Sequence, residues 1–167
     1  MMSDPAREFT RHTVATLAYR GTKILRAAPA EFGGVHAGDE SRKARSAVRI
    51  LSHINDLLEW TARLVAGAPD WREAWHASVP QSWEHEAGRF FEALQETDAI
   101  LITESTPTIS FERMFQGPIS DAFTHLGQLS MLRRLAGAPV RSEVMILSEI
   151  VAGRVGPEQA PPVREFD

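Results

Sequence analysis

The sequence contains no cysteine. Disulfide bonds, thiolate nucleophiles and zinc–thiolate sites are therefore excluded. If the protein holds a metal ion, histidine nitrogens and carboxylate oxygens must supply its ligands. The 167 residues include six histidines and 22 acidic residues, so ligands of this kind are available.

Long hydrophobic runs are also missing. No apolar segment approaches the roughly 20 residues of a membrane-spanning helix. Residues 1–21 carry scattered charges and have no continuous apolar region, unlike a secretory signal. We therefore expect a cytoplasmic protein with no membrane partner. The net charge of −4 gives no reason to expect nucleic acid as a partner, because phosphate binding needs a basic surface.

Several familiar catalytic motifs are absent. There is no Walker sequence, no GxGxxG and no GxSxG, so nucleotide-binding and serine-hydrolase functions have no support. His85 and Glu86 begin like the zinc-protease motif HExxH, but Arg89 stands where the second histidine is required. His12 and His76 have no partner at ligand spacing, and His36 lies in a glycine-rich loop.

Helical periodicity is the dominant pattern in the chain. Apolar residues recur at helical spacing in four long segments, with Pro and Gly at their ends. The predicted long helices are residues 5–28, 41–66, 81–103 and 118–136. Short helical segments are predicted at residues 70–78, 111–115 and 142–152, and residues 153–167 form a Gly- and Pro-containing tail.

These segments predict an all-α fold, a four-helix bundle with short additional helices, in a single domain covering residues 1–167. The connections after the first and third long helices are longer than minimal turns, so crossovers between helices are allowed. Gly127 lies inside the last long helix, where glycine costs about 1 kcal/mol relative to alanine. A glycine at such a position usually admits a close neighbouring backbone.

Three residues form the candidate metal site: His53, Asp121 and His125. Asp121 and His125 are four residues apart, which places both side chains on one face of a helix. His53 lies on the apolar side of the second long helix, between Ile50 and Leu57. Two imidazoles and one carboxylate suit a divalent ion and leave positions open for water or substrate.

Each of these residues also has a purely structural interpretation. Asp121 falls in the first turn of its helix, where the helix dipole stabilises a negative charge without any further role. A single histidine on a helix is more often a hydrogen-bonded, half-buried side chain than a ligand. Gln128 is either a hydrogen-bond partner of the site or a surface residue.

The segment SDAFTHLGQLSMLRRLAGAP, residues 120–139, resembles the C-terminal signature of the DinB-like superfamily of damage-inducible, metal-binding four-helix-bundle proteins. Members of that superfamily place one ligand histidine on the second helix, which matches His53 in RILSHINDLLEW. They place an HxxxH pair on a later helix, whose second histidine matches His125. The first histidine of the pair falls on Asp121, so this chain departs from the family pattern toward two histidines and one carboxylate.

The resemblance implies a divalent-metal-binding protein, with Ni, Zn, Fe, Mn or Co as the ion, that forms a homodimer. Family members include metal-dependent thiol transferases, so we expect a transferase or hydrolase that uses a low-molecular-weight thiol. Because the chain has no cysteine, the sulfur nucleophile would come from this cosubstrate. The alternative is a non-catalytic, stress-related helical bundle that binds a metal or a ligand. A third hypothesis is a metal-free bundle in which the three residues form a buried polar network.

Overall fold

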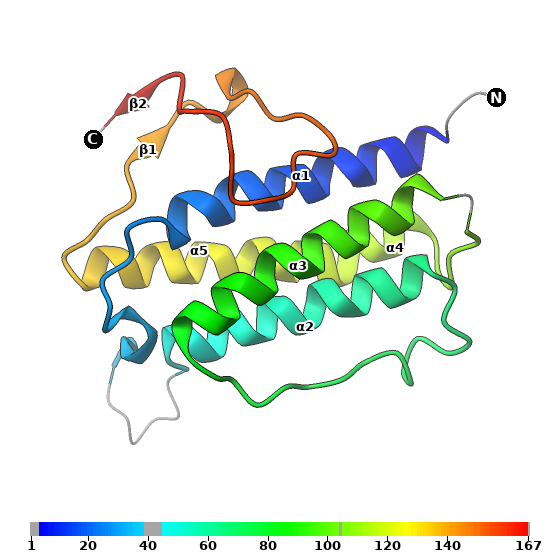
Figure 1. Ribbon diagram of the computed structural model, residues 1–167, viewed down its shortest axis with the longest axis horizontal. Helices are drawn as coiled ribbons and strands as arrows, with labels where there is room; N and C mark the ends of the chain where they lie inside the picture. The colour runs from blue at the N-terminus through cyan, green and yellow to red at the C-terminus, as the bar shows by residue number, and fades with distance from the viewer. Residues whose placement is uncertain (1–3, 39–44, 104, 167) are drawn as a thin grey trace.

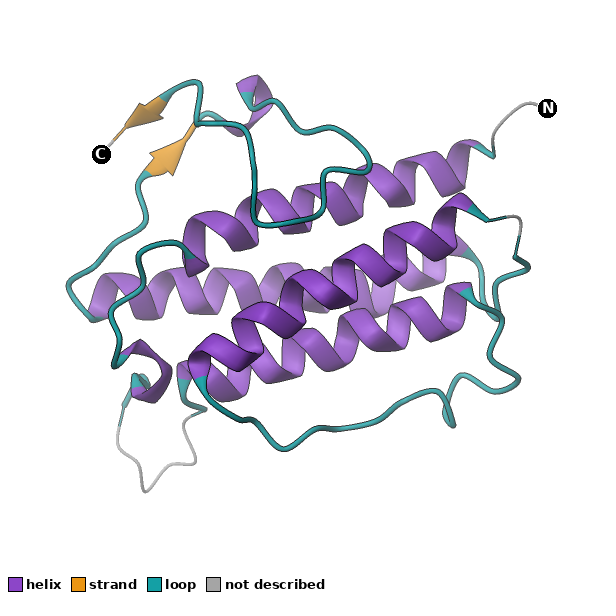
Figure 2. Cartoon of the chain, viewed as in Figure 1, coloured by secondary structure: helices purple, strands orange, loops and turns teal. Residues whose placement is uncertain are grey.

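The computed structural model describes residues 4–38, 45–103 and 105–166 and is largely helical (Figure 1; Figure 2). The four long helices of this part are α1 (Pro5–Leu25), α2 (Ala47–Val65), α3 (Trp83–Ile102) and α5 (Ser120–Leu135). The shorter helices are η1 (Phe32–Gly34), α4 (Phe111–Met114), the π-helical η3 (Phe115–Ile119) and η4 (Met145–Leu147). Two short antiparallel strands, β1 (Ser142–Glu143) and β2 (Glu165–Phe166), complete the elements of the described residues. The predicted all-α class is confirmed at this level.

The four long helices pack side by side (Figure 1). Helix α1 packs mainly against α3 and α5, and α2 packs mainly against the same two helices. Helices that follow each other in the sequence are therefore not always neighbours. The chain crosses over between α1 and α2 and again between α3 and α5, where the sequence has its longer connections.

Local signals in the sequence define several helix ends. The carboxylate of Asp4 accepts a hydrogen bond from the backbone of Ala6 at the start of α1, at 3.0 Å. The hydroxyl of Ser82 accepts one from the backbone of His85 at the start of α3, at 3.1 Å. The predicted stops after α2 and α5 are confirmed, because Gly67 and Gly137 have φ angles of 85° and 73° there, a region that favours glycine.

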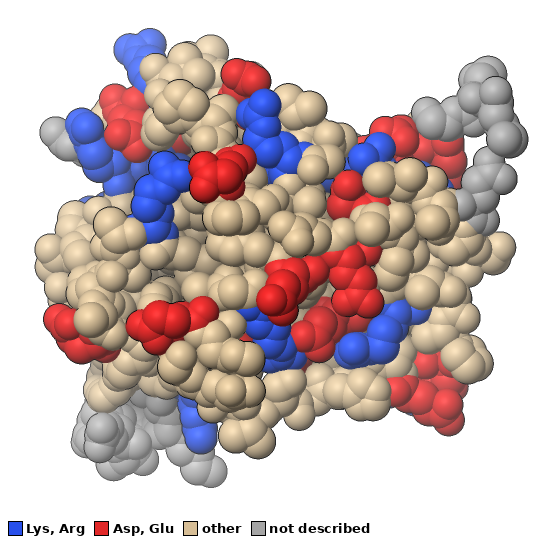
Figure 3. All heavy atoms as spheres, in the orientation of Figure 1, with Lys and Arg blue, Asp and Glu red and all other residues tan. Residues whose placement is uncertain are grey.

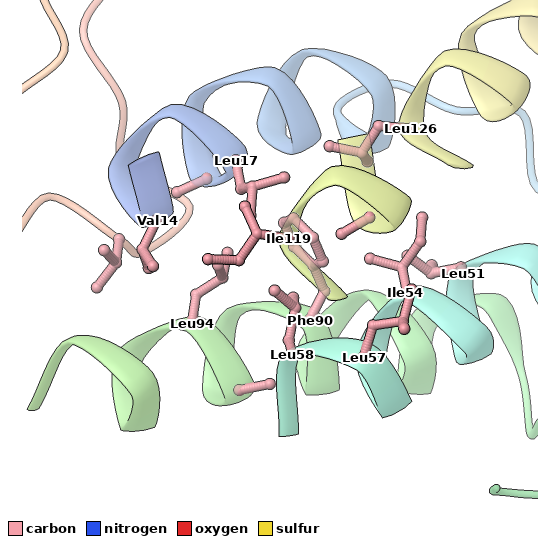
Figure 4. Close-up of a cluster of buried hydrophobic side chains, with 14 of the residues drawn as sticks. Val14, Leu17, Leu51, Ile54, Leu57, Leu58, Phe90, Leu94, Ile119 and Leu126 are labelled. Carbon is pink, nitrogen blue, oxygen red and sulfur yellow. The ribbon is translucent and has the colours of Figure 1, made fainter. Parts of the chain in front are cut away.

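The core lies between the four long helices, and its side chains point toward one another in Figure 4. The labelled residues come from α1, α2, α3, η3 and α5: Val14, Leu17, Leu51, Ile54, Leu57, Leu58, Phe90, Leu94, Ile119 and Leu126. Helices α1 and α3 approach closely at Gly21. A Cβ atom there would lie 2.3 Å from Cζ of Phe90, so a larger residue would force this buried ring to move.

The helix predicted at residues 142–152 is wrong, since β1, η4 and irregular backbone occupy this segment. The cause is the carboxylate of Glu143, which accepts hydrogen bonds from Tyr19 (2.8 Å), Ser148 (2.7 Å) and Lys23 (2.6 Å). In a helix, side chains five residues apart point in different directions. Glu143 and Ser148 can therefore meet only if the helix does not form.

The helix predicted at residues 70–78 is also wrong. The backbone makes a single turn, in which the amide of Ala74 donates to the carbonyl of Asp70 at 3.1 Å, and then continues without helical structure. The amide of Ser78 donates instead to the Asp56 carboxylate on α2, at 3.0 Å. This bond helps to hold the segment along α2.

One predicted helix start differs from the structure. Helix α2 begins at Ala47, while residues 41–44 of the predicted helix lie outside the described residues. The break predicted before Pro118 is present: although α4, η3 and α5 follow one another directly in the chain, two helices meet at a kink there. The backbone of Gly117 departs from helical geometry, with φ −97° and ψ −107°, and this kink accommodates the proline inside η3.

No helix within the described ranges combines the length and the apolar character needed to cross a membrane. On the face seen in Figure 3, acidic and basic side chains are interspersed with uncharged surface over α3 and the C-terminal segment.

Candidate functional site

The structure brings two of the three predicted ligands into contact. His53 lies near the middle of α2 and His125 lies on α5, and these two helices pack against each other. The imidazole ring centroids are 4.8 Å apart, with an angle of 74° between the ring planes. We call His53 and His125 the histidine pair.

The His125 ring is held by its own helix. Its Nδ1 lies 2.9 Å from Oε1 of Gln128, one turn further along α5. An amide oxygen accepts a hydrogen bond, so Nδ1 of His125 is the donor in this contact. Gln128 is therefore a hydrogen-bond partner of the site, one of the two interpretations that the sequence left open.

The third predicted ligand, Asp121, is exposed in the first turn of α5. Its charge acts on the imidazole of His53, but it makes no hydrogen bond or ion pair with the other described residues. Within residues 4–38, 45–103 and 105–166, no three histidine or acidic side chains lie close enough together to hold a metal ion. The structure thus assembles the histidine pair and leaves Asp121 beside it.

The surroundings of His53 favour its neutral form. Burial lowers the pKa of His53, and the nearby His125 and Arg45 lower it further. The charges of Asp56 and Asp121 act in the opposite direction but do not outweigh these effects. A neutral imidazole has a free nitrogen lone pair, which is the form that accepts a proton or binds a metal.

A cavity of about 350 Å³ opens beside His53. It lies between the first half of α2 and the segment that precedes α3, and its lining includes Arg45, Arg49, Ser52 and Ser78. Neither arginine has an ion pair or hydrogen bond with another described residue. The lining also includes the Asp56 carboxylate, which is paired with Arg89. Among the described residues the cavity therefore offers two unpaired guanidinium groups beside His53, a combination that suits an anionic group.

Apolar surface continues on the other side of Arg45. A second cavity of about 340 Å³ is lined by Ala37, Arg45, Ile50, Gln128, Met131 and Leu132. His53 borders the first cavity and Gln128 borders the second. The basic cavity thus reaches the histidine pair directly, and the apolar one reaches it through Gln128.

A network of ion pairs reaches the basic cavity through Asp56, and sequence reasoning missed it. Arg89 on α3 lies 2.6 Å from the carboxylates of both Asp56 and Glu59 on α2 and 3.2 Å from that of Glu86. It also donates to the hydroxyl of Ser78 at 2.8 Å. We call Arg89, Asp56, Glu59 and Glu86 the arginine cluster. Its signal in the sequence was the i, i+3 spacing of two acids on one helix and of Glu86 and Arg89 on the next.

Aromatic side chains cover the site on the side of the 66–82 segment. The Trp75 ring meets His53 edge to face, with centroids 5.8 Å apart. Trp75 in turn contacts Trp60 of α2 at 5.4 Å, and the indole N–H of Trp60 donates to the backbone carbonyl of Trp71 at 2.9 Å. These contacts keep the segment close to α2 and shield one side of the His53 imidazole.

The remaining histidines lie away from the pair. Three of them are exposed: His12, His76 and His85. His36 makes a local contact from Nδ1 to the carbonyl of Gly38 at 3.1 Å.

Comparisons with protein-family models, with curated proteins and with solved structures gave no match. The likeness to DinB-like proteins therefore remains a resemblance carried by the residues quoted above.

Proposed function

We propose that this chain is a cytoplasmic, DinB-like four-helix bundle that binds a divalent metal ion at His53, His125 and Asp121. The observation that carries the proposal is the contact between the two imidazoles across the α2–α5 interface, at 4.8 Å between centroids. Two half-buried histidines from different helices approach this closely without a hydrogen bond between them among the described contacts.

The chemistry of the donors supports a metal ion. The lowered pKa of His53 favours the neutral ring, which has a nitrogen lone pair to give, and Gln128 fixes the orientation of the His125 ring through Nδ1 in the manner common for metal-bound histidine. Asp121 has no competing partner within the described structure, so its carboxylate is free to complete the set. Nitrogen and oxygen ligands suit Ni, Zn, Fe, Mn or Co.

We further propose that the protein acts on a small molecule as a transferase or hydrolase, with a low-molecular-weight thiol as cosubstrate, and forms a homodimer. A divalent ion supplies Lewis acidity, which lowers the pKa of a water or thiol that it binds. Arg45 and Arg49 would bind an anionic group of the substrate in the basic cavity. Trp75 would exclude water from one side of the His53 ring.

A second candidate function is a non-catalytic bundle that binds a small ligand without a metal. One observation favours it: no group of three potential ligands is close enough to hold an ion within the described residues. In this case the basic and apolar cavities around Arg45 would bind the ligand, and the histidine pair would be a neutral part of the wall.

The test is metal binding by the untagged protein, measured by elemental analysis after incubation with Ni²⁺ or Zn²⁺ and dialysis. We expect about one ion per chain for a three-ligand site. His53→Ala and His125→Ala should abolish binding, and Gln128→Ala should weaken it by about 10-fold to 100-fold. The matched control is His12→Ala, which removes an exposed histidine of α1 and should leave the metal content unchanged.

The variant Asp121→Ala tests whether the Asp121 carboxylate is the third metal ligand. A clear loss of affinity would support the carboxylate as a ligand, whereas unchanged binding would leave only the two imidazoles. A wild-type protein that takes up neither Ni²⁺ nor Zn²⁺ would contradict the metal proposal and favour the metal-free binding function.

A further inference from the structure

A third cavity lies on a different side of α5 from the histidine pair. Its volume is about 390 Å³, and it is enclosed by the second half of α1, by α5 and by residues 140–145 of the C-terminal segment. Its α5 residues include Phe123, Gly127 and Arg134, whereas the proposed metal ligands on that helix are Asp121 and His125. With 3.6 residues per turn, Gly127 and His125 point in nearly opposite directions. The two sites are therefore separate.

The charges that line this cavity do not balance. Lys23 pairs with Glu143 at 2.6 Å and with Glu165 at 3.0 Å, and Arg141 lies 3.5 Å from Glu165. These contacts account for the acidic groups near the cavity. Two further arginines of the lining, Arg20 and Arg134, have no ion pair or hydrogen bond within the described residues. The cavity thus has an excess of positive charge at exposed guanidinium groups of α1 and α5.

One wall of the cavity is built around a buried charge. The side chain of Glu143 is only 1% exposed, yet it is fully partnered by the Tyr19 hydroxyl, the Ser148 hydroxyl and the Lys23 ammonium. Burial opposes the charged form of Glu143, but these hydrogen bonds outweigh it and lower the pKa of the carboxyl. The C-terminal segment is therefore fastened to α1 beside the cavity, and the position of Lys23 is fixed.

Gly127 is part of the lining of this cavity, at a position where most residues would place a side chain. A close neighbouring backbone was expected at this glycine, and that expectation is wrong: an ideal Cβ on Gly127 would meet no described atom within 4 Å. Glycine lowers helix stability relative to alanine, so its presence in the middle of α5 has a cost that no packing contact explains. The missing side chain leaves open space in the cavity wall.

The other walls are apolar. Ile24, Phe123, Leu126, Val140 and Met145 contribute to the lining together with the charged residues. Ligand cavities of a few hundred Å³ typically combine an apolar wall with a few polar groups that orient the ligand. Here the charged groups with unused hydrogen-bond capacity are cationic, and the hydroxyls of Ser130 and Ser142 lie in the same lining.

We propose that this cavity is a binding site for a small organic acid, in which a carboxylate binds Arg20 and Arg134 and an apolar body rests against α5 over Gly127. Arginine suits the anion because its guanidinium donates two parallel hydrogen bonds to one carboxylate. The apolar body gains by covering Phe123 and Leu126. This site is independent of the proposed metal ion.

The experiment is isothermal titration calorimetry of the full chain with octanoate as the probe. Octylammonium, which has the same apolar body and the opposite charge, serves as the ligand control, and inorganic phosphate tests the anion without the apolar body. We expect saturable binding of octanoate and none of octylammonium. Arg20→Gln and Arg134→Gln should each weaken octanoate binding by about 10-fold to 100-fold, since each removes a charge-assisted hydrogen bond.

Gly127→Leu tests the cavity itself. Leucine is a far better helix former than glycine, so the variant should unfold at a temperature no lower than the wild type while octanoate binding is lost. Gly127→Ala should weaken octanoate binding less than Gly127→Leu does. Its unfolding temperature should likewise be no lower than that of the wild type. Arg113→Gln, an exposed arginine of α4, is the matched control and should leave binding unchanged.

Three results would overturn the proposal: no saturable heat with octanoate, equal binding of octylammonium, or unchanged octanoate binding in Gly127→Leu. Phosphate that binds as well as octanoate would show that the site selects only charge, which also contradicts an apolar subsite.

Discussion

Helix α2 has polar side chains at both of its main helix interfaces, and the two groups differ in how completely they are partnered. Toward α3 it contributes Asp56 and Glu59 to the arginine cluster, where the guanidinium of Arg89 reaches three carboxylates. Toward α5 it contributes His53, whose ring meets His125 and has no hydrogen bond with any other described residue. The charged groups of the arginine cluster are partnered within the protein, whereas the histidine pair keeps hydrogen-bonding capacity for a ligand.

The arginine cluster shows what a structural polar interface requires. Glu86 is 1% exposed, and its carboxylate accepts hydrogen bonds from the amide of Gln81, from Asn55 and from Arg89. Burial opposes the charge on Arg89, but its bonds to Glu59 and Asp56 outweigh that cost and raise the pKa of the guanidinium. Charges buried in this way are stable only because nearly every one has a partner.

The histidine pair meets none of these requirements. Its rings are half-buried, its single hydrogen bond among the described residues is from His125 to Gln128, and His53 borders the basic cavity. A polar group that serves the fold is normally satisfied by the protein, whereas one that serves a ligand is satisfied when the ligand binds. The difference between the two interfaces of α2 is therefore the main structural support for a binding role of the pair.

The largest effect on stability should follow from disrupting the arginine cluster. Arg89→Met leaves the carboxylates of Asp56 and Glu86 buried without their cation, and we expect it to lower the free energy of unfolding by about 3–5 kcal/mol. Urea denaturation followed by circular dichroism measures this change. Arg72→Met is the matched control, because Arg72 is 70% exposed and its pair with Asp70 should contribute less than about 1 kcal/mol.

If Arg89→Met lowered the free energy of unfolding as little as Arg72→Met does, this result would contradict the structural role of the arginine cluster. Metal content provides the second half of the comparison: a folded Arg89→Met protein should still bind metal, because Arg89 contacts neither imidazole in the described structure.

A smaller effect on stability is expected from a substitution in the histidine pair. His53→Phe keeps an aromatic ring against Trp75 and removes no hydrogen bond, so the free energy of unfolding at neutral pH should change by less than about 1 kcal/mol. The same variant should lose metal binding completely. Urea denaturation and elemental analysis of one preparation measure both quantities, and a severe loss of stability would show that the pair serves the fold instead.

How far the sequence predicted these features depended on the range of the interactions involved. The apolar stripe of α2 and the stops at Gly67 and Gly137 follow from residues within a few turns, and both predictions are confirmed. The segment around Glu143 was misassigned because its partners, Tyr19 and Lys23, are more than 100 residues away in the sequence. Local periodicity carries no information about such contacts.

The candidate site was predictable in part for the same reason. The shared face of Asp121 and His125 follows from helical spacing, but the contact between His125 and His53 depends on α5 packing against α2, which is set by the crossovers. The arginine cluster needed the register of α3 on α2, so its acids and Arg89 were visible in the sequence only as separate i, i+3 pairs. Whether Asp121 completes a metal site remains a prediction.

The smallest effect concerns pH. Burial lowers the pKa of His53 in the folded protein, with further lowering from His125 and Arg45 against the opposing charges of Asp56 and Asp121. An unfolded chain has a histidine pKa of about 6.5, so the unfolded state binds the proton first as pH falls. Above that value His53 is neutral in both states and contributes nothing. Below it the free energy of unfolding should decrease, until pH passes the folded pKa.

Comparison of the wild type with His53→Phe between about pH 8 and pH 5 isolates this contribution. The stability of the variant relative to the wild type should rise as pH falls below about 6.5, because the variant lacks the penalty of a buried imidazolium. A constant difference would show that His53 titrates normally. With saturating Zn²⁺ the wild type should lose stability more steeply over the same range, because protonation of the imidazole competes with the ion. That added slope, absent in His53→Phe, would distinguish a metal-binding histidine pair from one that is merely half-buried.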